Sequence, residues 1–437
     1  MRLIKSVSIS LVAKLITVLI AFPTSIIIAR HLGPSGRGIF AVLATLTGVA
    51  LQFGNFGFHS SSIYFSTKNR NLIPSIAGIL IVFGIIIGLI AGFSIILLDA
   101  FFPKVILGDV PYLFLIITLV ALPFAFISQF LQNLLLGMQR IYEYNVVDVV
   151  AKALMFAIVI LLFLVLNRGI FELILVTTLI TVLSSLVYIY FTKRNTSIAL
   201  SADILLIKRM AGYGLKAYIA ALFAFLVIRS DMMLVNYFRG ISDTGLYSLA
   251  VSLADLLLLI PATVGTMLFL KATAIGDEKS ELTKKVSRHT VLLMGIVCLI
   301  AAVAAKPAIV FIYGAAFAPS VSAFLWILPG VFFLSLETIY MNEFASRGMP
   351  PIVYITPAIG FIINITLNIV LVPRIGFIAA SITSSLAYFL MFVTSLIYFR
   401  NISGATYKEI LVVKPGEVIE VFQAGYGKFL ALKAARL

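Results

Sequence analysis

Long runs of apolar residues recur along the whole chain, and this feature limits its fold more than any other. A helix needs about 20 apolar residues to cross a bilayer. Hydrophobic residues make up 62% of the 437 residues and charged residues only 11%, whereas a soluble domain carries about 25% charged residues. A soluble core could not bury this much apolar surface. We therefore expect an all-α integral membrane protein.

The apolar runs predict twelve membrane-spanning helices. They lie near 7–29, 38–66, 74–98, 111–135, 145–166, 170–191, 212–238, 245–269, 288–312, 321–345, 352–372 and 376–399. With this count, 21 Lys and Arg residues fall on the side of the N-terminus and seven on the other side. Because positive residues gather in cytoplasmic loops, both termini are predicted to be cytoplasmic. The first run has no clear cleavage site and is interpreted as a retained helix.

A repeat divides these helices into two sets of six. The stretch ARHLGPSGRGIFAV (29–42) aligns with YFRGISDTGLYSLA (237–250), so that Gly33 matches Gly240 and Gly38 matches Gly245. Two later echoes, around 137 and 348 and around 169 and 376, keep nearly the same offset. Six is even, so both halves enter the membrane in the same sense, as parallel repeats do.

The repeat predicts an N-terminal six-helix lobe at 1–200, a C-terminal six-helix lobe at 201–400, and a cytoplasmic tail at 401–437. Two such bundles enclose a central cleft that can open to either side, which indicates transport by alternating access. A duplicated scaffold without a pathway is the alternative. The tail mixes apolar and basic residues, so it is either an amphipathic helix on the inner leaflet or a disordered segment.

Three motifs carry a resemblance to a known family: ARHLGPSGRGIF, the glycine-broken QFGNFGF (52–58), and RSDMMLVNYFRGISDTGLYSLA (229–250). In order and spacing the chain resembles bacterial O-antigen-type polysaccharide repeat-unit flippases of the multidrug/oligosaccharidyl-lipid/polysaccharide flippase superfamily. The resemblance implies a V-shaped cleft between two lobes and a location in the bacterial inner membrane. It also implies a cargo of oligosaccharide on undecaprenyl diphosphate for surface polysaccharide such as lipopolysaccharide, with polymerase machinery as a partner. Many members have fourteen helices, which differs from the count here.

Four cations are candidate ligands for the diphosphate. Lys14 lies on a stripe of small and polar residues, which indicates either a cavity wall or a helix–helix contact. Lys216 and Arg229 lie within one apolar run, and Arg30 lies at the outer mouth. Phosphate needs cations that stay charged when partly desolvated. For Arg229 the alternative is a structural pair with Asp231 or with an acid on a neighbouring helix.

Three acids are also predicted at membrane depth: Asp231, Asp255 and Glu337. A buried carboxylate can couple transport to H⁺ or Na⁺, or it can neutralise a nearby Arg or Lys. Both readings stay open for each residue. Several tyrosines at helix ends, among them Tyr213 and Tyr313, fit anchoring at the membrane interface, and a sugar-stacking role is an untested alternative.

The sequence contains no nucleotide-binding P-loop, no HExxH, GxSxG or CxxC motif, and one cysteine, Cys298. We therefore predict no catalytic residue, no metal site and no cofactor beyond a coupling ion. The net charge of +15 fits cytoplasmic loops and membrane lipids rather than nucleic acid. Rival functions are an ion-coupled multidrug antiporter of the same superfamily, a membrane glycosyltransferase or polymerase, and a scaffold. The sequence leaves open the sugar, the surface polymer, the driving ion and the oligomeric state.

Overall fold

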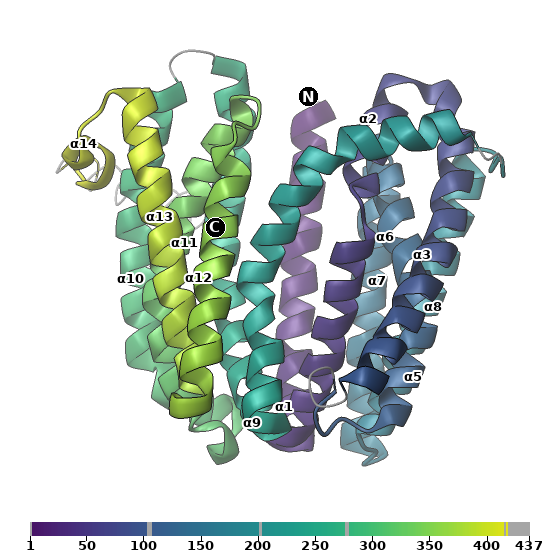
Figure 1. Cartoon of the computed structure of the whole chain (residues 1–437), viewed down its shortest axis with the longest axis horizontal. Helices are drawn as coiled ribbons and strands as arrows, with labels where there is room; N and C mark the ends of the chain where they lie inside the picture. Colours follow the sequence, from purple (N-terminus) through teal and green to yellow (C-terminus); the bar gives the residue numbers. More distant parts are fainter. Residues whose placement is uncertain (1, 103–106, 201–202, 276–278, 415–416, 418–437) are drawn as a thin grey trace, which may run out of the picture. The chain divides into compact units, whose positions relative to one another are not determined.

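The computed structural model confirms the predicted all-α membrane fold (Figure 1). It describes residues 2–102, 107–200, 203–275, 279–414 and 417. Within these ranges every regular element is a helix, and ten segments are long and apolar enough to cross a membrane. The chain is thus a multi-pass membrane protein.

Two helices are long enough to hold two predicted spans each. They are α1 (Arg2–Gly54), with 53 residues, and α9 (Ile204–Ile275), with 72 residues. A single glycine interrupts each of them: Gly33 has φ 64° and ψ −172°, and Gly240 has φ 80° and ψ −178°. These angles fall in a backbone region that is essentially restricted to glycine.

The chain folds back at both glycines, as contacts across them show. The Arg37 guanidinium lies 2.9 Å from the Ser25 hydroxyl, although twelve residues of straight helix would span about 18 Å. Likewise the Tyr247 hydroxyl donates a hydrogen bond to Asp231, sixteen residues earlier. Each long helix is therefore a helical hairpin. Ten apolar segments, two of which fold back, account for the twelve predicted spans in the described part of the chain.

Most of the other helices follow the predicted spans. These other helices are α2 (Phe58–Lys68), α3 (Ile73–Phe101), α5 (Tyr112–Val120), α6 (Leu122–Gly137), α7 (Ile141–Ile160), α8 (Ile170–Asn195), α10 (Lys279–Tyr313), α11 (Ser320–Ser346), α12 (Ile352–Ile375), α13 (Phe377–Ser403) and α14 (Tyr407–Leu411). However, the span predicted at 38–66 is broken before α2, the span predicted at 111–135 is divided into α5 and α6, and α14 lies in the predicted tail. Pro111 precedes α5, and Pro123 stands in the first turn of α6, where its missing N–H removes no helical hydrogen bond.

Contacts divide the chain into two compact units. Unit 1 comprises Met1–Leu249, Pro307–Ser320 and Ile365–Ala380, and unit 2 comprises Ala250–Lys306, Val321–Asn364 and Ser381–Leu437. The helices α9, α10, α12 and α13 therefore each contribute residues to both units, and α11 begins with Ser320 of unit 1 and continues in unit 2. The lobes expected from the repeat, 1–200 and 201–400, remain a prediction. Residues 418–437 of the predicted tail lie outside the described residues.

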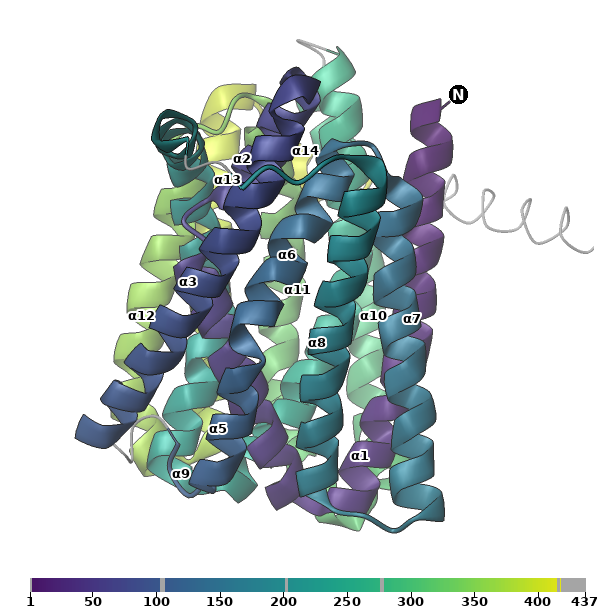
Figure 2. The same ribbon diagram turned by 90° about the vertical axis from the view of Figure 1, so that its right-hand side faces the viewer.

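In unit 1, α3, α6, α7 and α8 lie side by side (Figure 2). Phe126 and Phe130 of α6 are fully buried and pack with Leu80 of α3 and Leu115 of α5 in one hydrophobic core. In both views α2 lies at the end of unit 1 that also holds the N-terminus. The apolar core thus holds the bundle together, while α2 continues α1 at that end.

The two glycine reversals contact each other reciprocally within unit 1. A Cβ atom added to Gly38 would lie 2.0 Å from the Ile241 carbonyl oxygen, and one added to Gly245 would lie 1.8 Å from the Pro34 carbonyl oxygen. In the repeat alignment Ile241 matches Pro34 and Gly245 matches Gly38. The same backbone contact is therefore made twice, with the roles exchanged, as in an isologous interface. Both contacts are too close for any residue with a side chain.

The second half of α1 runs antiparallel to the first half of α9. Along α1, Gly48 faces the ring of Phe225, and Gly57, just beyond the helix end, lies against the backbone of Gly214. Small residues let two membrane helices approach closely in this way. The close approach extends from the reversals to the end of unit 1 where α2 begins.

The helix α7 ends in a π-turn, Leu161–Val165, in which the Leu166 N–H bonds to the Leu161 carbonyl. Within this turn the Phe163 ring stacks on the imidazole of His31, with ring centroids 4.5 Å apart. His31 Nε2 also lies 2.9 Å from the Arg168 carbonyl oxygen. The stack therefore holds the wide turn against α1, next to the first reversal.

Unit 2 contains a polar seam between α10 and α11. The buried Glu343 carboxylate accepts hydrogen bonds from Thr283 at 2.8 Å and from Arg347 at 2.7 and 2.9 Å. One turn away, Ser287 and Tyr340 share a hydrogen bond of 2.8 Å. Buried polar groups in lipid need such partners, and here the two helices satisfy each other.

Candidate functional site

A buried arginine marks the first reversal. Arg37 is only 6% exposed, and its guanidinium donates to the hydroxyls of Ser248 at 3.0 Å and Ser25 at 2.9 Å. Tyr313, at the end of α10, contacts both Arg37 and Ser25 and is 3% exposed. The prediction that Tyr313 anchors the chain at the membrane interface is therefore wrong. Arg37 joins both hairpins and the end of α10 inside unit 1.

A buried aspartate marks the second reversal. Asp231 is 1% exposed and Tyr247 is fully buried. The Asp231 carboxylate accepts hydrogen bonds from the Tyr247 hydroxyl and, at 2.7 Å, from the Met232 backbone N–H. Since Tyr247 precedes Ser248, the hydrogen bonds of Asp231 and those of Arg37 end on neighbouring residues. The two reversals thus place one cation and one anion in a single buried network.

Asp231, a candidate for ion coupling, therefore lies in this network. A carboxylate held by a phenol and a backbone N–H is stabilised as an anion. Within the described residues no group of three or more His, Cys, Asp or Glu side chains is placed to hold a metal ion. The network can hold charge and exchange hydrogen-bond partners, and it offers no arrangement of nucleophile and base.

Lys14 is exposed on the first half of α1. One turn earlier, the Ser10 hydroxyl accepts a hydrogen bond of 3.1 Å from the Asn145 amide of α7. The polar stripe thus faces α7 at this level, which agrees with a helix–helix contact. Among the described residues, however, no carboxylate lies within ion-pair distance of Lys14, although Asp148 follows Asn145 by one turn on α7.

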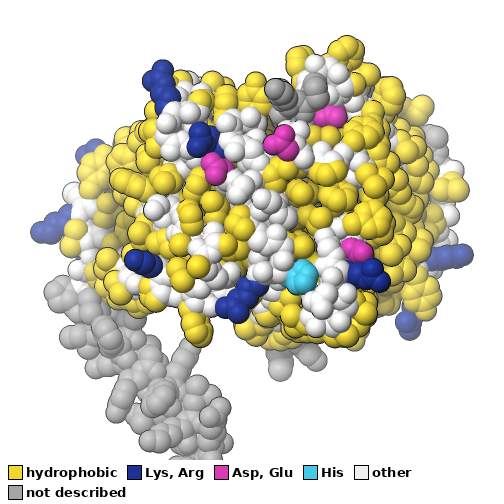
Figure 3. All heavy atoms as spheres, turned by 90° about the horizontal axis from the view of Figure 1, so that it is seen from below, with side chains coloured by type: hydrophobic (Ala, Val, Ile, Leu, Met, Phe, Trp, Pro, Cys, Tyr) yellow, Lys and Arg dark blue, Asp and Glu magenta, His cyan; other side chains and the backbone are white. Residues whose placement is uncertain are grey.

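Arg30 closes the end of a helix. Its guanidinium donates to the carbonyl of Ile312 at 2.7 Å and to that of Phe311. The last carbonyls of a helix have no helical partner, and a cation there also balances the helix dipole. Arg30 is nevertheless exposed at this end of unit 1. Figure 3 views the molecule from this end and shows Lys and Arg side chains scattered singly among hydrophobic ones.

Three of the remaining candidates, Lys216, Arg229 and Asp255, lie far from Lys14 in the sequence. The Lys216 side chain lies outside the described residues, although α9 includes its backbone. Arg229 and Asp255 are half-buried, and each has an interaction partner. Both lie on α9, Arg229 in unit 1 and Asp255 in unit 2.

Glu337 lies in the interior of unit 2. It is 5% exposed and makes no hydrogen bond or ion pair with the residues the structure describes. Phe333 and Tyr340, one turn before and after it, both contact Phe392 of α13. Glu337 therefore lies on a mainly aromatic face, where a bare carboxylate is costly.

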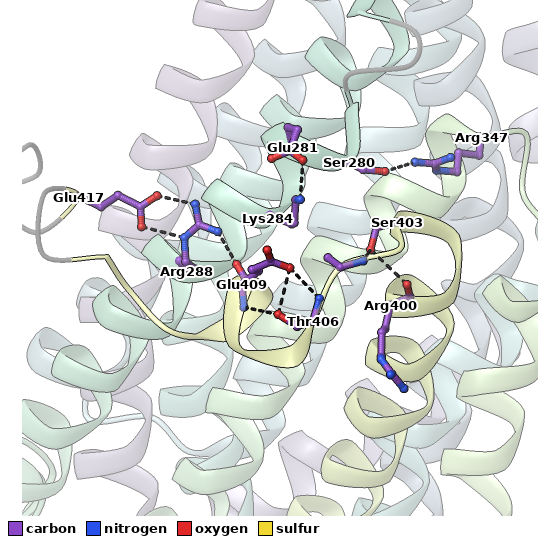
Figure 4. A network of polar contacts seen from close by, with 11 residues as sticks. Ser280, Glu281, Lys284, Arg288, Arg347, Arg400, Ser403, Thr406, Glu409 and Glu417 are labelled. Atoms are coloured by element: carbon purple, nitrogen blue, oxygen red, sulfur yellow. Dashed lines mark hydrogen bonds and ion pairs between the residues drawn. The ribbon is translucent and has the colours of Figure 1, made fainter.

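In unit 2 the guanidinium of Arg288 is paired with a carboxylate. Arg288 of α10 donates to both carboxylate oxygens of Glu417, at 2.8 and 2.5 Å, and to the Glu409 carbonyl (Figure 4). The Thr406 hydroxyl and the Glu409 carboxylate cap α14 reciprocally. The Arg288 guanidinium holds the pKa of Glu417 at about 2, below its usual 4.5. This pairing, which we call the latch, ties the chain after α13 back to α10.

Sequence reasoning missed Arg37, Tyr247 and the latch. Arg37 is among the seven Lys and Arg residues that the predicted spans place on the outer side, because it follows Gly33 in a polar stretch between two spans. For two of these residues the sequence did contain a signal, because Arg37 and Tyr247 both lie inside the repeated motif. The latch joins residues 129 positions apart, and no pattern in the sequence connects them.

Comparison with known proteins gives a family. The family model described as "Polysaccharide biosynthesis protein" matches residues 3–269, more than half of the chain. An uncharacterized membrane protein of Methanocaldococcus jannaschii is 24% identical over 202 residues, which are 45% of this chain and 40% of that protein. The match therefore spans less than half the length of that relative.

Solved structures with the same fold are similar over most of their length. The lipid II flippase MurJ in an inward closed conformation has a TM-score of 0.77 at 14% identity, over 94% of this chain and 91% of that one. An inward-facing MATE family multidrug transporter of the MOP superfamily has a TM-score of 0.75 at 14% identity, over 89% and 94%. A MOP superfamily transporter from Pyrococcus furiosus has a TM-score of 0.65 at 13% identity, over 92% and 96%. At these identities the similarity establishes the fold.

Proposed function

Because the chain belongs to the polysaccharide biosynthesis protein family, we propose that it is a flippase for lipid-linked oligosaccharide. It moves an oligosaccharide on undecaprenyl diphosphate from the cytoplasmic to the outer leaflet by alternating access. The fold shared with a lipid II flippase supports this proposal. The chain works in a bacterial inner membrane with both termini in the cytoplasm, and it hands its cargo to polysaccharide polymerase machinery. The polymer is O-antigen or a related surface polysaccharide.

One observation carries the proposal. Lys14 is exposed in the first membrane span and has no carboxylate partner among the described residues. Holding a charge at membrane depth costs energy unless a partner or water receives it. A diphosphate provides such a partner, because it concentrates negative charge and accepts several hydrogen bonds. Lys216, Arg229 and Arg30 are proposed to receive the diphosphate at other stages of its passage.

The test uses purified protein in liposomes loaded with a labelled undecaprenyl-diphosphate oligosaccharide. Transport is the fraction of label that becomes accessible to a glycosidase that cannot cross the membrane. Lys14→Gln should slow transport about tenfold, as expected from the loss of one charge-assisted phosphate contact. Lys208→Gln, an exposed lysine near the start of α9, is the matched control. Equal rates for wild type and Lys14→Gln, at equal protein levels, would remove Lys14 from the site.

Transport also needs a driving force, and buried carboxylates supply candidates for H⁺ or Na⁺ coupling. Glu337 is the strongest of the three, because it is buried and has no partner among the residues that the structure describes. Asp231 and Asp255 are the others. Glu337→Gln should abolish the acceleration of transport by an imposed H⁺ or Na⁺ gradient and leave slow transport without a gradient intact. Acceleration that survives in this variant would assign coupling to another residue.

The rival function is an ion-coupled multidrug antiporter. The fold shared with a MATE transporter favours it, and so do the buried acids. It predicts that expression of the chain raises resistance to cationic drugs in a drug-sensitive strain. The flippase proposal predicts no such change, together with restored polymer export in a flippase-deficient strain.

A further inference from the structure

A strained break separates α1 from α2. After Gly54 the chain passes through Asn55, Phe56 and Gly57, with φ 45° at Phe56 and 77° at Gly57. A bulky residue rarely adopts positive φ, and such strain persists only where the surroundings fix it. Here Gly57 is pressed against the backbone of Gly214. The Phe56 ring remains 49% exposed, so burial of the ring does not offset the strain.

Aromatic rings from two helices gather at this break. Phe56 lies 6.1 Å from the ring of Tyr218, whose hydroxyl donates to the Phe53 carbonyl at 3.0 Å. That carbonyl belongs to the last turn of α1, where the helix leaves such groups without a partner. Phe53 is itself 47% exposed. The phenol of Tyr218 is thus turned to the backbone, and the rings of Phe56 and Tyr218 lie close together beside the exposed Phe53.

A second pair of aromatic rings joins α2 to α9. Tyr64 of α2 stacks on Tyr213 of α9 with centroids 4.0 Å apart, and Tyr213 is 48% exposed. The Lys68 ammonium lies 5.5 Å from the Tyr64 ring centre. Tyr213 and Tyr218 are five residues apart on α9, about 7.5 Å along the helix axis and about 140° around it. The Tyr64–Tyr213 stack therefore lies on a different side of α9 from Tyr218 and fixes α2 against α9.

One unsatisfied polar group accompanies the rings. The Gln52 amide nitrogen is buried and has no hydrogen-bond partner in the described part of the chain. Gln52 follows Gly48 by one turn, on the face that meets Phe225 of α9. Beyond it, the Asn55 amide and His59 Nδ1 lie 3.1 Å apart. A buried amide donor without an acceptor costs about 1–3 kcal/mol, so a ligand that accepts its hydrogen bond gains affinity.

We propose that the cluster at the break, Gln52, Phe53, Phe56 and Tyr218, binds the sugar rings of the lipid-linked cargo. This inference rests on the proposed function. A pyranose ring has an apolar C–H face that stacks on aromatic rings and hydroxyls that accept from an amide. A lipid chain matches the rings and leaves the amide unsatisfied, whereas the sugar matches both. Aromatic anchors at a membrane surface turn their hydroxyls to water, and Tyr218 bonds to a carbonyl instead.

The experiment compares two lipids on full-length protein in nanodiscs: undecaprenyl diphosphate carrying the oligosaccharide, and undecaprenyl diphosphate alone. Phe56→Gly, which also relieves the backbone strain, and Tyr218→Ala should each weaken binding of the sugar-bearing lipid about tenfold. Binding of the bare lipid should not change. Tyr218→Phe keeps the ring and should retain most of the affinity. Tyr142→Ala is the control, because Tyr142 is 67% exposed on α7.

Gln52→Leu separates a binding role from a structural one. Replacing an unpaired buried amide with an apolar group should raise the thermal unfolding midpoint, and the same change should weaken binding of the sugar-bearing lipid. Equal losses for both lipids, or no loss in any variant, would overturn the sugar subsite. Wild-type protein that binds neither lipid would instead contradict the proposed function.

Discussion

The reversals at Gly33 and Gly240 have the same backbone and opposite chemistry. Each is a glycine with nearly the same angles, and each packs its following helix against the other reversal, at Gly38 and Gly245. The first buries the cation of Arg37, however, and the second the anion of Asp231. The repeat position of Arg37 is Thr244, and that of Asp231 is Thr24. Duplication thus preserved what the backbone requires and left the side chains free to acquire separate roles.

The backbone contact that the two reversals share, at Gly38 and Gly245, predicts the largest effect. Gly245→Ala and Gly38→Ala place a Cβ 1.8 and 2.0 Å from a carbonyl oxygen, so the two helices must separate. Each substitution should destabilise the fold by about 3 kcal/mol and lower the thermal unfolding midpoint of the purified protein. Gly212→Ala on α9, with nothing within 4 Å, should stabilise it slightly. Clearly unequal losses at 38 and 245 would contradict the reciprocity of the contact.

The buried charge of Arg37 predicts a smaller effect, which should differ between the two reversals. Arg37→Lys keeps the charge and loses the fork that reaches Ser248 and Ser25 together. It should cost about 2 kcal/mol, as hydrogen bonds to charged groups do. Thr244→Lys at the matching position tests the converse: Thr244 is fully buried and its hydroxyl donates to the Gly240 carbonyl, so the added ammonium should also destabilise the fold. If Arg37→Lys melts like wild type, the arginine is present for its charge alone.

The hydroxyl of Tyr247 sharpens the comparison further, because its repeat counterpart is Phe40. Tyr247→Phe removes one hydrogen bond to Asp231 and should cost about 1.5 kcal/mol. Phe40→Tyr adds a hydroxyl where the ring packs on an apolar cluster with α7, and it should also destabilise. Thermal unfolding of the two single variants and the double variant measures both effects. A gain in stability from Phe40→Tyr would mean that the first reversal has an acceptor of its own.

The latch gives the smallest effect, because it ties only the short helix α14 and the chain after it to α10, through the ion pair of Arg288 with Glu417. The pKa of Glu417 is depressed to about 2 from 4.5. A depressed pKa contributes stability above the unfolded value and loses it as the pH falls through the folded one. The latch should therefore hold at pH 5–8 and open progressively between about pH 4.5 and 2. Hydrogen exchange of α14 measures this opening, and Glu417→Gln should show fast exchange throughout.

The sequence was sufficient for the fold, because lipid forces every span to be a long apolar helix. The repeat was also visible in the sequence, and it contains both glycines at which the chain of unit 1 reverses. The site was harder to predict. Arg37 finds Ser248 at a distance of 211 residues, and only the folded chain shows that an arginine beside a loop is buried. Lys14 stood out because a lysine in an apolar run is conspicuous, and its role in binding remains a prediction.

The π-turn at the end of α7 changes how that helix must be numbered around its axis. An i→i+5 hydrogen bond at Leu161 inserts an extra residue into the turn. The last residues of this turn, up to Val165, are therefore rotated relative to a wheel drawn from Ile141, by up to about the 100° that one residue occupies in an α-helix. A labelling scan along α7 should show one phase up to Ile160 and a shifted phase beyond it. Faces assigned from a single uninterrupted wheel would place the last turn on the wrong neighbour.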